Sequence, residues 1–222
     1  MKARPADPIT AAFEERAVRR EGDRELPLGP KARRTREAIL AAAADQFVAH
    51  GYLHTSIAAV AEAADVSLGT VYQYFRDRSD LVAALVQRGV VEMLRQDTTW
   101  RASEGRDGLD RVLGNFVRSY TTYASMAGVW EEVSHVDGDL AQLRRQLGRI
   151  FTSSVERELR RGAEAGVVRD DVDPAIAARA LTAMVDRYCY VTYVFDPPRP
   201  LPSADESVAT LASLWSAAVG LC

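Results

Sequence analysis

Residues 55–81 constrain the fold of this chain more than any other stretch, because they alternate helix-forming runs with helix-ending residues. A hydroxyl at Thr55 or Ser56 can cap a first helix by accepting from the free N–H groups at its start. The apolar residues that follow at helical spacing are Ile57, Val60, Ala61 and Ala64. This spacing predicts a short helix with a narrow apolar face.

The next residues predict a tight turn and a second short helix. Asp65 tolerates a turn conformation, and Ser67 can cap the helix that follows it. That helix, residues 68–75, places Val71 and Phe75 four residues apart on one inward face. The order of helix, tight turn and helix is typical of a helix-turn-helix, whose second helix enters the major groove of DNA.

The outward side chains of this second helix suit a DNA surface. Gly69 keeps the backbone slim enough for close approach to a phosphate or a base. Thr70 offers a hydroxyl and a methyl group, and the Gln73 amide can both donate to and accept from an adenine edge. Groups suited to phosphate oxygens follow at Tyr72, Tyr74 and Arg78. The alternative is a small helical corner whose tyrosines pack and whose polar residues are solvated.

Positive charge is concentrated just before this unit. The net charge is -3, but four of the six basic residues in the range 31–81 fall within KARRTR at 31–36. Phosphate contacts dominate DNA affinity, so a local basic arm matters more than the charge of the whole chain. We expect this arm to contact phosphates or the minor groove. A solvated charge run on a flexible tail is the alternative.

Residues 35–81 resemble the DNA-binding domain of TetR-family transcriptional regulators, with the family's spacing kept throughout. The matching residues are Thr35, Arg36, Ile39, Leu40, Ala42, Ala43, Phe47, Gly51, Thr55, Ser56, Ile57, Ala61, Ala64, Val66, Ser67, Gly69, Thr70, Tyr72, Tyr74, Phe75 and Leu81. Asp65 stands where the family usually has Gly, and Arg78 where it usually has Lys. The resemblance implies a regulator that binds a double-stranded, palindromic DNA operator.

The patterns and the resemblance together define the expected DNA contacts. Base reading is expected from Leu68, Thr70 and Gln73. Phosphate contacts are expected from the basic arm at 31–36 and from Ser56, Tyr72, Tyr74 and Arg78. The full predicted set is Arg33, Arg34, Arg36, Thr55, Ser56, Ser67, Leu68, Gly69, Thr70, Tyr72, Gln73, Tyr74 and Arg78.

The chain divides into three predicted segments. Residues 1–30 are interrupted by Pro and Gly, and an isolated helix there would be marginal, so we expect a disordered extension. Residues 31–95 form the DNA-binding domain, in which Thr35–His50 is the first ordered helix and Arg78–Gln96 links to the rest. Residues 96–222 form an effector-binding and dimerisation domain.

The second domain shows a loop pattern at residues 101–107 and four helical patterns, at residues 108–127, 137–166, 174–195 and 203–221. No strand pattern competes with them. The predicted fold is therefore all-α with about nine helices, and it resembles the TetR layout throughout.

The last two helical patterns, 174–195 and 203–221, are apolar over much of their circumference. A helix that is apolar on two faces needs two partners, so one face can close an isologous four-helix interface. We therefore predict a homodimer, which would hold two recognition helices about 34–36 Å apart on DNA. A deeper core within one protomer is the alternative.

Aromatic and sulfur-containing side chains in the second domain suit a largely apolar cavity with a few hydrogen-bonding groups. The candidate ligand-binding residues are Phe116, Tyr120, Tyr123, Met126, Trp130, Phe151, Met184 and Tyr188. Residues 130–135 lie in the least regular connection, where they could line an entrance. By resemblance to the family, we expect a repressor that a small hydrophobic effector releases from DNA. The aromatic content alone suggests an effector of a lipid-like or fatty-acyl type. Ordinary core packing is the alternative.

Other functions find less support in the sequence. The three histidines are scattered, and the sequence has no nucleophile elbow, metal motif or phosphate-binding glycine loop. We therefore expect no enzymatic activity, no bound metal and no cofactor. Two cysteines, no signal peptide and no membrane-spanning run predict a cytoplasmic protein without a membrane partner. The alternatives are a DNA-binding regulator or architectural protein without an effector, and an activator instead of a repressor.

Overall fold

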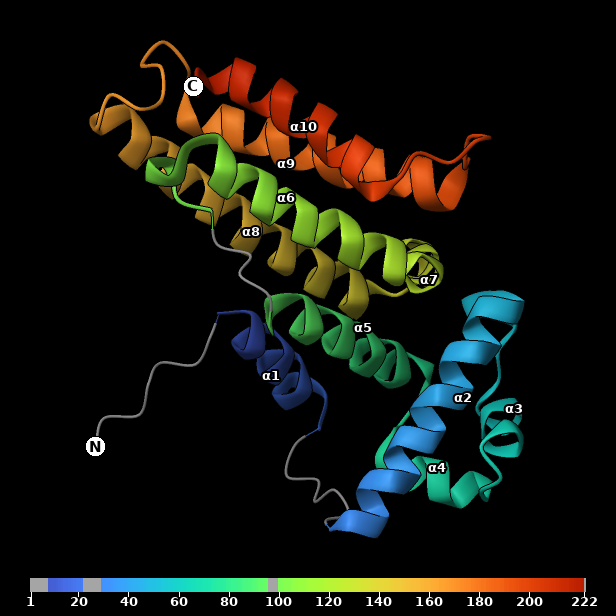
Figure 1. Cartoon of the computed structure of the whole chain (residues 1–222). Coiled ribbons are helices and arrows are strands. Elements are labelled where there is room, and N and C mark those ends of the chain that lie inside the picture. Colours follow the sequence, from blue (N-terminus) through green and yellow to red (C-terminus); the bar gives the residue numbers. More distant parts are fainter. Residues whose placement is uncertain (1–7, 22–28, 96–99, 222) are drawn as a thin grey trace. The chain divides into compact units, whose positions relative to one another are not determined.

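The computed structural model describes residues 8–21, 29–95 and 100–221, and every regular element in them is helical (Figure 1). The α-helices are α1 (Pro8–Glu21), α2 (Pro30–His54), α3 (Ile57–Ala63), α4 (Leu68–Tyr74), α5 (Arg78–Arg95), α6 (Gly105–Thr122), α7 (Ala124–Val136), α8 (Gly138–Glu164), α9 (Pro174–Tyr190) and α10 (Ala204–Val219). A 3-10 turn, η1 (Ala102–Glu104), precedes α6, and a π-helical turn, η2 (Val191–Phe195), follows α9. The prediction of an all-α fold is confirmed.

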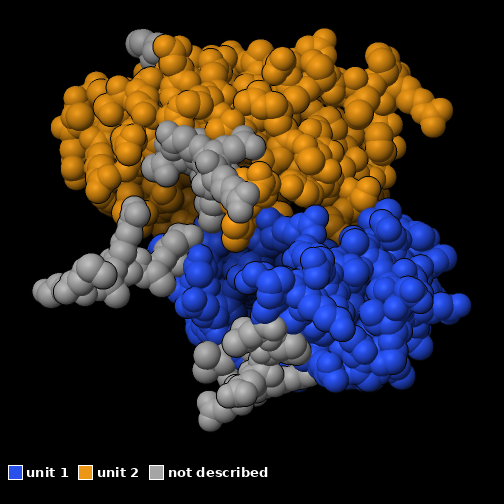
Figure 2. Space-filling view, turned by 60° about the horizontal axis from the view of Figure 1, so that its bottom comes forward, with its two compact units in different colours: residues 1–88, 128–147 blue, residues 89–127, 148–222 orange. Residues whose placement is uncertain are grey.

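The chain forms two compact units, which Figure 2 shows in different colours. The first comprises residues 1–88 and 128–147, and the second comprises residues 89–127 and 148–222. The first unit contains the predicted helix-turn-helix, and the second contains most of the predicted effector and dimer helices. The domain boundary near Arg95 stays a prediction.

Residues 8–21 are helical, in contrast to the disorder predicted for the N-terminal extension. The inward stripe of α1 carries Ile9, Ala12 and Phe13, all buried, and ends in the buried Arg16. Sequence reasoning judged this helix alone, where it would be marginal, whereas burial of its apolar stripe within the first unit stabilises it. Residues 1–7 and 22–28 of the predicted extension lie outside the described residues.

Helix α2 is longer than predicted at both ends. It begins at Pro30, which suits a first helical position because it has no N–H to satisfy. The cluster at residues 31–36 therefore lies in helical turns and is not a flexible arm. At the other end Gly51 has φ 76° and interrupts the helix, as predicted, but helical structure resumes and reaches His54.

The second unit has its own apolar core. Helix α10 packs along α6, and buried side chains of α9 complete the cluster. Asp173 caps α9, and Ser203 and Glu206 form a reciprocal cap at the start of α10. Two local predictions are wrong: residues 101–107 form η1 and the start of α6 instead of a loop, and residues 130–135 lie within α7 instead of an irregular connection.

Candidate nucleic-acid interface

Two serine caps and one left-handed residue fix the helix-turn-helix geometry. Ser56 Oγ accepts from the Ala59 N–H at 3.0 Å at the start of α3, and Ser67 Oγ accepts from the Thr70 N–H at 3.0 Å at the start of α4. Between the helices Asp65 adopts φ 52°, a conformation that Asp tolerates better than most residues. The turn that usually carries Gly in the family is therefore made here by an aspartate.

Helix α4 presents one exposed stripe. Leu68, Gly69, Tyr72 and Gln73 are exposed, whereas Val71 is fully buried. Because residues four apart lie above one another on a helix, the stripe consists of a Leu68–Tyr72 column beside a Gly69–Gln73 column. The first column is largely apolar and the second is polar, so α4 offers two kinds of contact side by side.

Two other predicted contacts on this helix are less accessible. The Thr70 hydroxyl lies 2.8 Å from Ser67 Oγ, so it takes part in the cap of α4. Tyr74 is half-buried on a different face from the exposed stripe. Of the side chains predicted to read bases, Leu68 and Gln73 are therefore the exposed ones.

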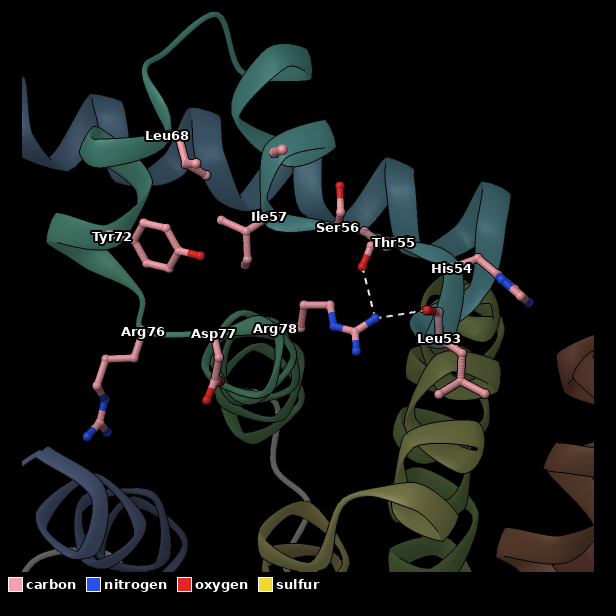
Figure 3. Close-up of a pocket in the computed structure, with 11 residues that line it drawn as sticks. Leu53, His54, Thr55, Ser56, Ile57, Leu68, Tyr72, Arg76, Asp77 and Arg78 are labelled. Carbon is pink, nitrogen blue, oxygen red and sulfur yellow. Dashed lines mark hydrogen bonds between the residues drawn. The ribbon is translucent and has the colours of Figure 1, made fainter.

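The side chains of Arg78 and Thr55 form hydrogen bonds within the first unit. Arg78 Nη1 donates to the carbonyl oxygen of Tyr52 at 2.8 Å. It also donates to the carbonyl oxygens of Leu53 at 2.9 Å and Thr55 at 3.0 Å (Figure 3). Its guanidinium also lies 4.8 Å from the centre of the Tyr52 ring. The Thr55 hydroxyl donates to the carbonyl oxygens of Gln46 and Gly51. The residue Thr55 as a whole is only 2% exposed. Both side chains therefore hold the end of α2 together.

The basic cluster stands at the start of α2. Lys31, Arg33 and Arg34 are exposed there, so their charges are available to phosphates. Arg36 is half-buried, and its guanidinium lies 5.3 Å from the centre of the Phe75 ring at the end of α4. This cation–π contact brings the basic turns of α2 next to the recognition helix.

An open groove of about 480 Å³ lies where α3, α4, the end of α2 and the start of α5 meet (Figure 3). Its lining residues are Leu53, His54, Thr55, Ser56, Ile57, Ala58, Leu68, Tyr72, Arg76, Asp77 and Arg78. Sequence reasoning did not select Arg76, whose Nε donates to Asp80 Oδ2 at 3.2 Å. The spacing of Arg76 and Asp80, four residues apart across the start of α5, was the signal that could have found it.

Helix α7 also contacts the end of α2 within the first unit. The Glu132 carboxylate accepts from the backbone N–H of Tyr52 at 3.0 Å and of Leu53 at 3.4 Å. The pKa of the Tyr52 hydroxyl is raised to about 12. Burial is the largest cause, and the negative charge of Asp137 is the next largest. The acidic pair at 131–132 is thus engaged: Glu131 pairs with Arg144, and Glu132 binds α2.

The structure brings together part of the predicted ligand-binding set. All eight residues are half-buried, and Phe116, Tyr120, Met184 and Tyr188 pack against the core of the second unit. The Tyr188 and Tyr193 hydroxyls lie 2.8 and 2.7 Å from Ser207 Oγ, a polar group that the prediction missed. Trp130 belongs to the first unit.

No group of three or more His, Cys, Asp and Glu side chains in residues 8–21, 29–95 and 100–221 could hold a metal ion. Over the same residues, no helix combines the length and apolar character needed to cross a membrane.

Comparisons with known proteins agree with this geometry. Residues 39–85 match the family model for bacterial regulatory proteins of the tetR family, and residues 102–189 match the model for a tetracyclin repressor-like C-terminal domain. The HTH-type transcriptional regulator YhgD of Bacillus subtilis is 25% identical over 185 residues, which cover 81% of this chain and 93% of YhgD. The fatty acid metabolism regulator protein of the same organism is 20% identical over 177 residues, covering 78% and 91%.

Among solved structures, the SmeT–triclosan complex has a TM-score of 0.68 and 23% sequence identity, covering 83% of this chain and 91% of SmeT. SmeT is the repressor of the Stenotrophomonas maltophilia multidrug efflux pump SmeDEF. At this identity the likeness shows a shared fold. The two family models add the functional assignment, because one covers the helix-turn-helix and the other covers most of the helices that follow it. The chain therefore belongs to the TetR family and is a DNA-binding transcriptional regulator.

Proposed function

We propose that this regulator is a homodimeric repressor that binds a palindromic operator and releases it when a small hydrophobic ligand binds. The observation that carries the operator half of the proposal is the exposed stripe of α4, which presents the Gln73 amide and the apolar Leu68 side chain. Such a helix can enter the major groove and distinguish base edges there.

The contacts divide between reading and positioning. Gln73 has the two-headed amide that pairs with adenine N6 and N7, so we assign it to base reading. Lys31, Arg33 and Arg34 carry exposed charges at the start of α2, and we assign them to phosphates. Ser56, at the exposed start of α3, is a further phosphate contact.

Two features support dimerisation through α9 and α10. Each helix buries one face in the core of its own unit, yet Ile176 on α9 is 70% exposed and Leu214 on α10 is 53% exposed. Exposed alanines, Ala180, Ala183, Ala217 and Ala218, accompany them. Small and apolar side chains outside the core are suited to a close-packed isologous interface.

A hydrophobic effector is supported by the second unit and by the relatives. Half-buried Phe116, Tyr120 and Met184 pack against the core of the second unit, which includes Tyr193. The Tyr188 and Tyr193 hydroxyls both lie within hydrogen-bond distance of Ser207 Oγ. This combination offers apolar surface with a few polar groups, as small-molecule sites do. One relative is named for fatty acid metabolism and one neighbour is a complex with triclosan, so fatty acids, their acyl thioesters and chlorinated phenols are the first classes to test.

The decisive experiment is selection of bound sequences from a random duplex pool with the purified chain. An enriched palindrome is the expected result, whereas binding that simply follows salt would reject a sequence-reading repressor. The selected operator then serves in a release assay with the three ligand classes. If no member of this panel changes operator affinity, the effector half of the proposal fails and the DNA-binding half stands.

A further inference from the structure

Leu68 is an apolar side chain in an unusual place. It is the first residue of α4, directly after the Ser67 cap, and it remains 45% exposed. Tyr72, one turn later, is also 45% exposed, and Ile57 of α3 lines the same groove (Figure 3). Single exposed apolar residues are common, but here exposed Leu68 and Tyr72 and half-buried Ile57 line one groove at the edge of the recognition helix.

The chemistry of the major groove restricts what this apolar corner can meet. Base edges there present hydrogen-bond donors and acceptors, and the C5-methyl of thymine is their one apolar group. The polar contact on the same stripe comes from Gln73, five residues after Leu68, or about 7.5 Å along a helix axis. Since base pairs are about 3.4 Å apart, this separation is large enough for the two side chains to contact different base pairs when the helix lies along the groove.

We infer that Leu68, supported by Tyr72 and Ile57, reads the C5-methyl group of a thymine in each operator half-site. The inference rests on the proposed operator binding and names a base that the polar residues alone do not specify. Leu68 makes the methyl contact, and the other two side chains keep water away from it.

The test replaces thymine by deoxyuridine, which removes only the methyl group and keeps every hydrogen bond of the base pair. Each thymine of the selected operator is exchanged in turn, in both half-sites together. For the unaltered protein we expect one position at which affinity falls about fourfold for each methyl group lost. With Leu68→Ala, thymine and deoxyuridine should bind equally at that position.

Two matched variants make the result specific. Leu53→Ala removes another leucine of the same groove, 54% exposed but located on α2, and should keep the deoxyuridine penalty. Gln73→Ala should lose discrimination at its own base pair and likewise keep the penalty. Thermal unfolding of all variants checks that the exposed substitutions leave the fold intact.

The outcomes separate this inference from the operator proposal. If selection enriches no palindrome, operator reading itself is rejected and the methyl contact with it. If an operator is found but no thymine shows a deoxyuridine penalty, or Leu68→Ala leaves the penalty unchanged, only the methyl contact is overturned.

Discussion

The Glu132 carboxylate of α7 accepts a 3.0 Å hydrogen bond from the backbone N–H of Tyr52, immediately after the non-helical Gly51 of α2. The N–H of Leu53 points to the same carboxylate at 3.4 Å. Gly51 frees these two N–H groups from the helical ladder, and a side chain from a segment 79–80 residues away satisfies them. The end of α2 is therefore anchored from α7 as well as by Arg78.

We expect Glu132→Ala to lower the free energy of unfolding by about 1.5–3 kcal/mol, because backbone donors would lose a charged acceptor. Glu132→Gln keeps one acceptor oxygen and should cost less. Chemical denaturation measures both changes, with Glu62→Ala as an exposed control that should stay within about 0.5 kcal/mol. Equal stability of Glu132→Ala and the control would show that the anchor is unimportant.

The buried pair of Arg16 and Asp80 should be sensitive to loss of either partner. Their side chains are 6% and 10% exposed, and Arg16 also donates to Ser79 Oγ at 2.8 Å. Replacing Arg16 removes its hydrogen bonds to Asp80 and Ser79, while Arg76 still pairs with Asp80, so Arg16→Met should destabilise the protein by about 1.5–3 kcal/mol. In a double-mutant cycle with Asp80→Asn, the combined loss should be smaller than the sum of the single losses. Additive losses would argue against a direct coupling.

Gln73→Ala and Arg34→Ala should affect DNA binding differently. Removing the amide should cost about 1–3 kcal/mol at one base position and relax specificity there. Removing the exposed arginine should weaken all sequences alike and reduce the salt slope by about one. Titrations of operator and random duplexes at several salt concentrations separate the two effects. Identical behaviour of both variants would contradict the division between reading and positioning.

Leu214→Lys should weaken the dimer. The substitution places a charge in the proposed α9–α10 interface, where desolvating it is unfavourable. Val136→Lys on α7 is the control, since Val136 has the same 53% exposure as Leu214 but lies outside that interface. Light scattering after gel filtration should show a shift toward monomer for Leu214→Lys alone. A dimer of unchanged stability in both variants would place the interface elsewhere.

The stability of the protein should fall as the pH rises from about 10 to about 12, in part because of Tyr52. Burial raises the pKa of its hydroxyl from 10.0 to about 12, so the unfolded chain loses this proton before the folded one does. The contribution is fully present below pH 10 and disappears as the pH passes 12. Tyr52→Phe keeps the ring under Arg78 and should flatten this part of the profile, measured by denaturation at each pH. An unchanged slope would remove Tyr52 as a cause.

Sequence reasoning succeeded where the signal was local. The cap at Ser67, the turn at Asp65 and the inward Val71 all depend on neighbours within a few residues, and the structure has each as predicted. Of the two predicted caps of the first helix, Thr55 and Ser56, the structure uses Ser56. The helix-turn-helix could therefore be recognised without any knowledge of tertiary contacts.

The remaining features depend on contacts between segments far apart in the sequence. From the sequence alone, Arg78 is predicted to be an accessible cation beside the groove. In the structure it donates instead to the carbonyls of residues 52, 53 and 55. From the sequence alone, the segment of α1 is predicted to be part of a disordered extension. In the structure Arg16 of this helix pairs with Asp80, which lies 64 residues later in the chain. Burial and partner identity at such sites follow from tertiary packing, which periodicity along one segment does not reveal.

The placement of the tryptophans gives the molecule a built-in optical reporter. Trp100 and Trp215 are buried edge to face with ring centres 6.2 Å apart, whereas Trp130 is half-buried on α7, two residues before Glu132. An aqueous collisional quencher therefore reaches the Trp130 indole in preference to the other two. Quenching of the intrinsic tryptophan fluorescence consequently reports on the solvent access of Trp130. It therefore follows changes around α7, the helix that anchors the end of α2, without an attached dye.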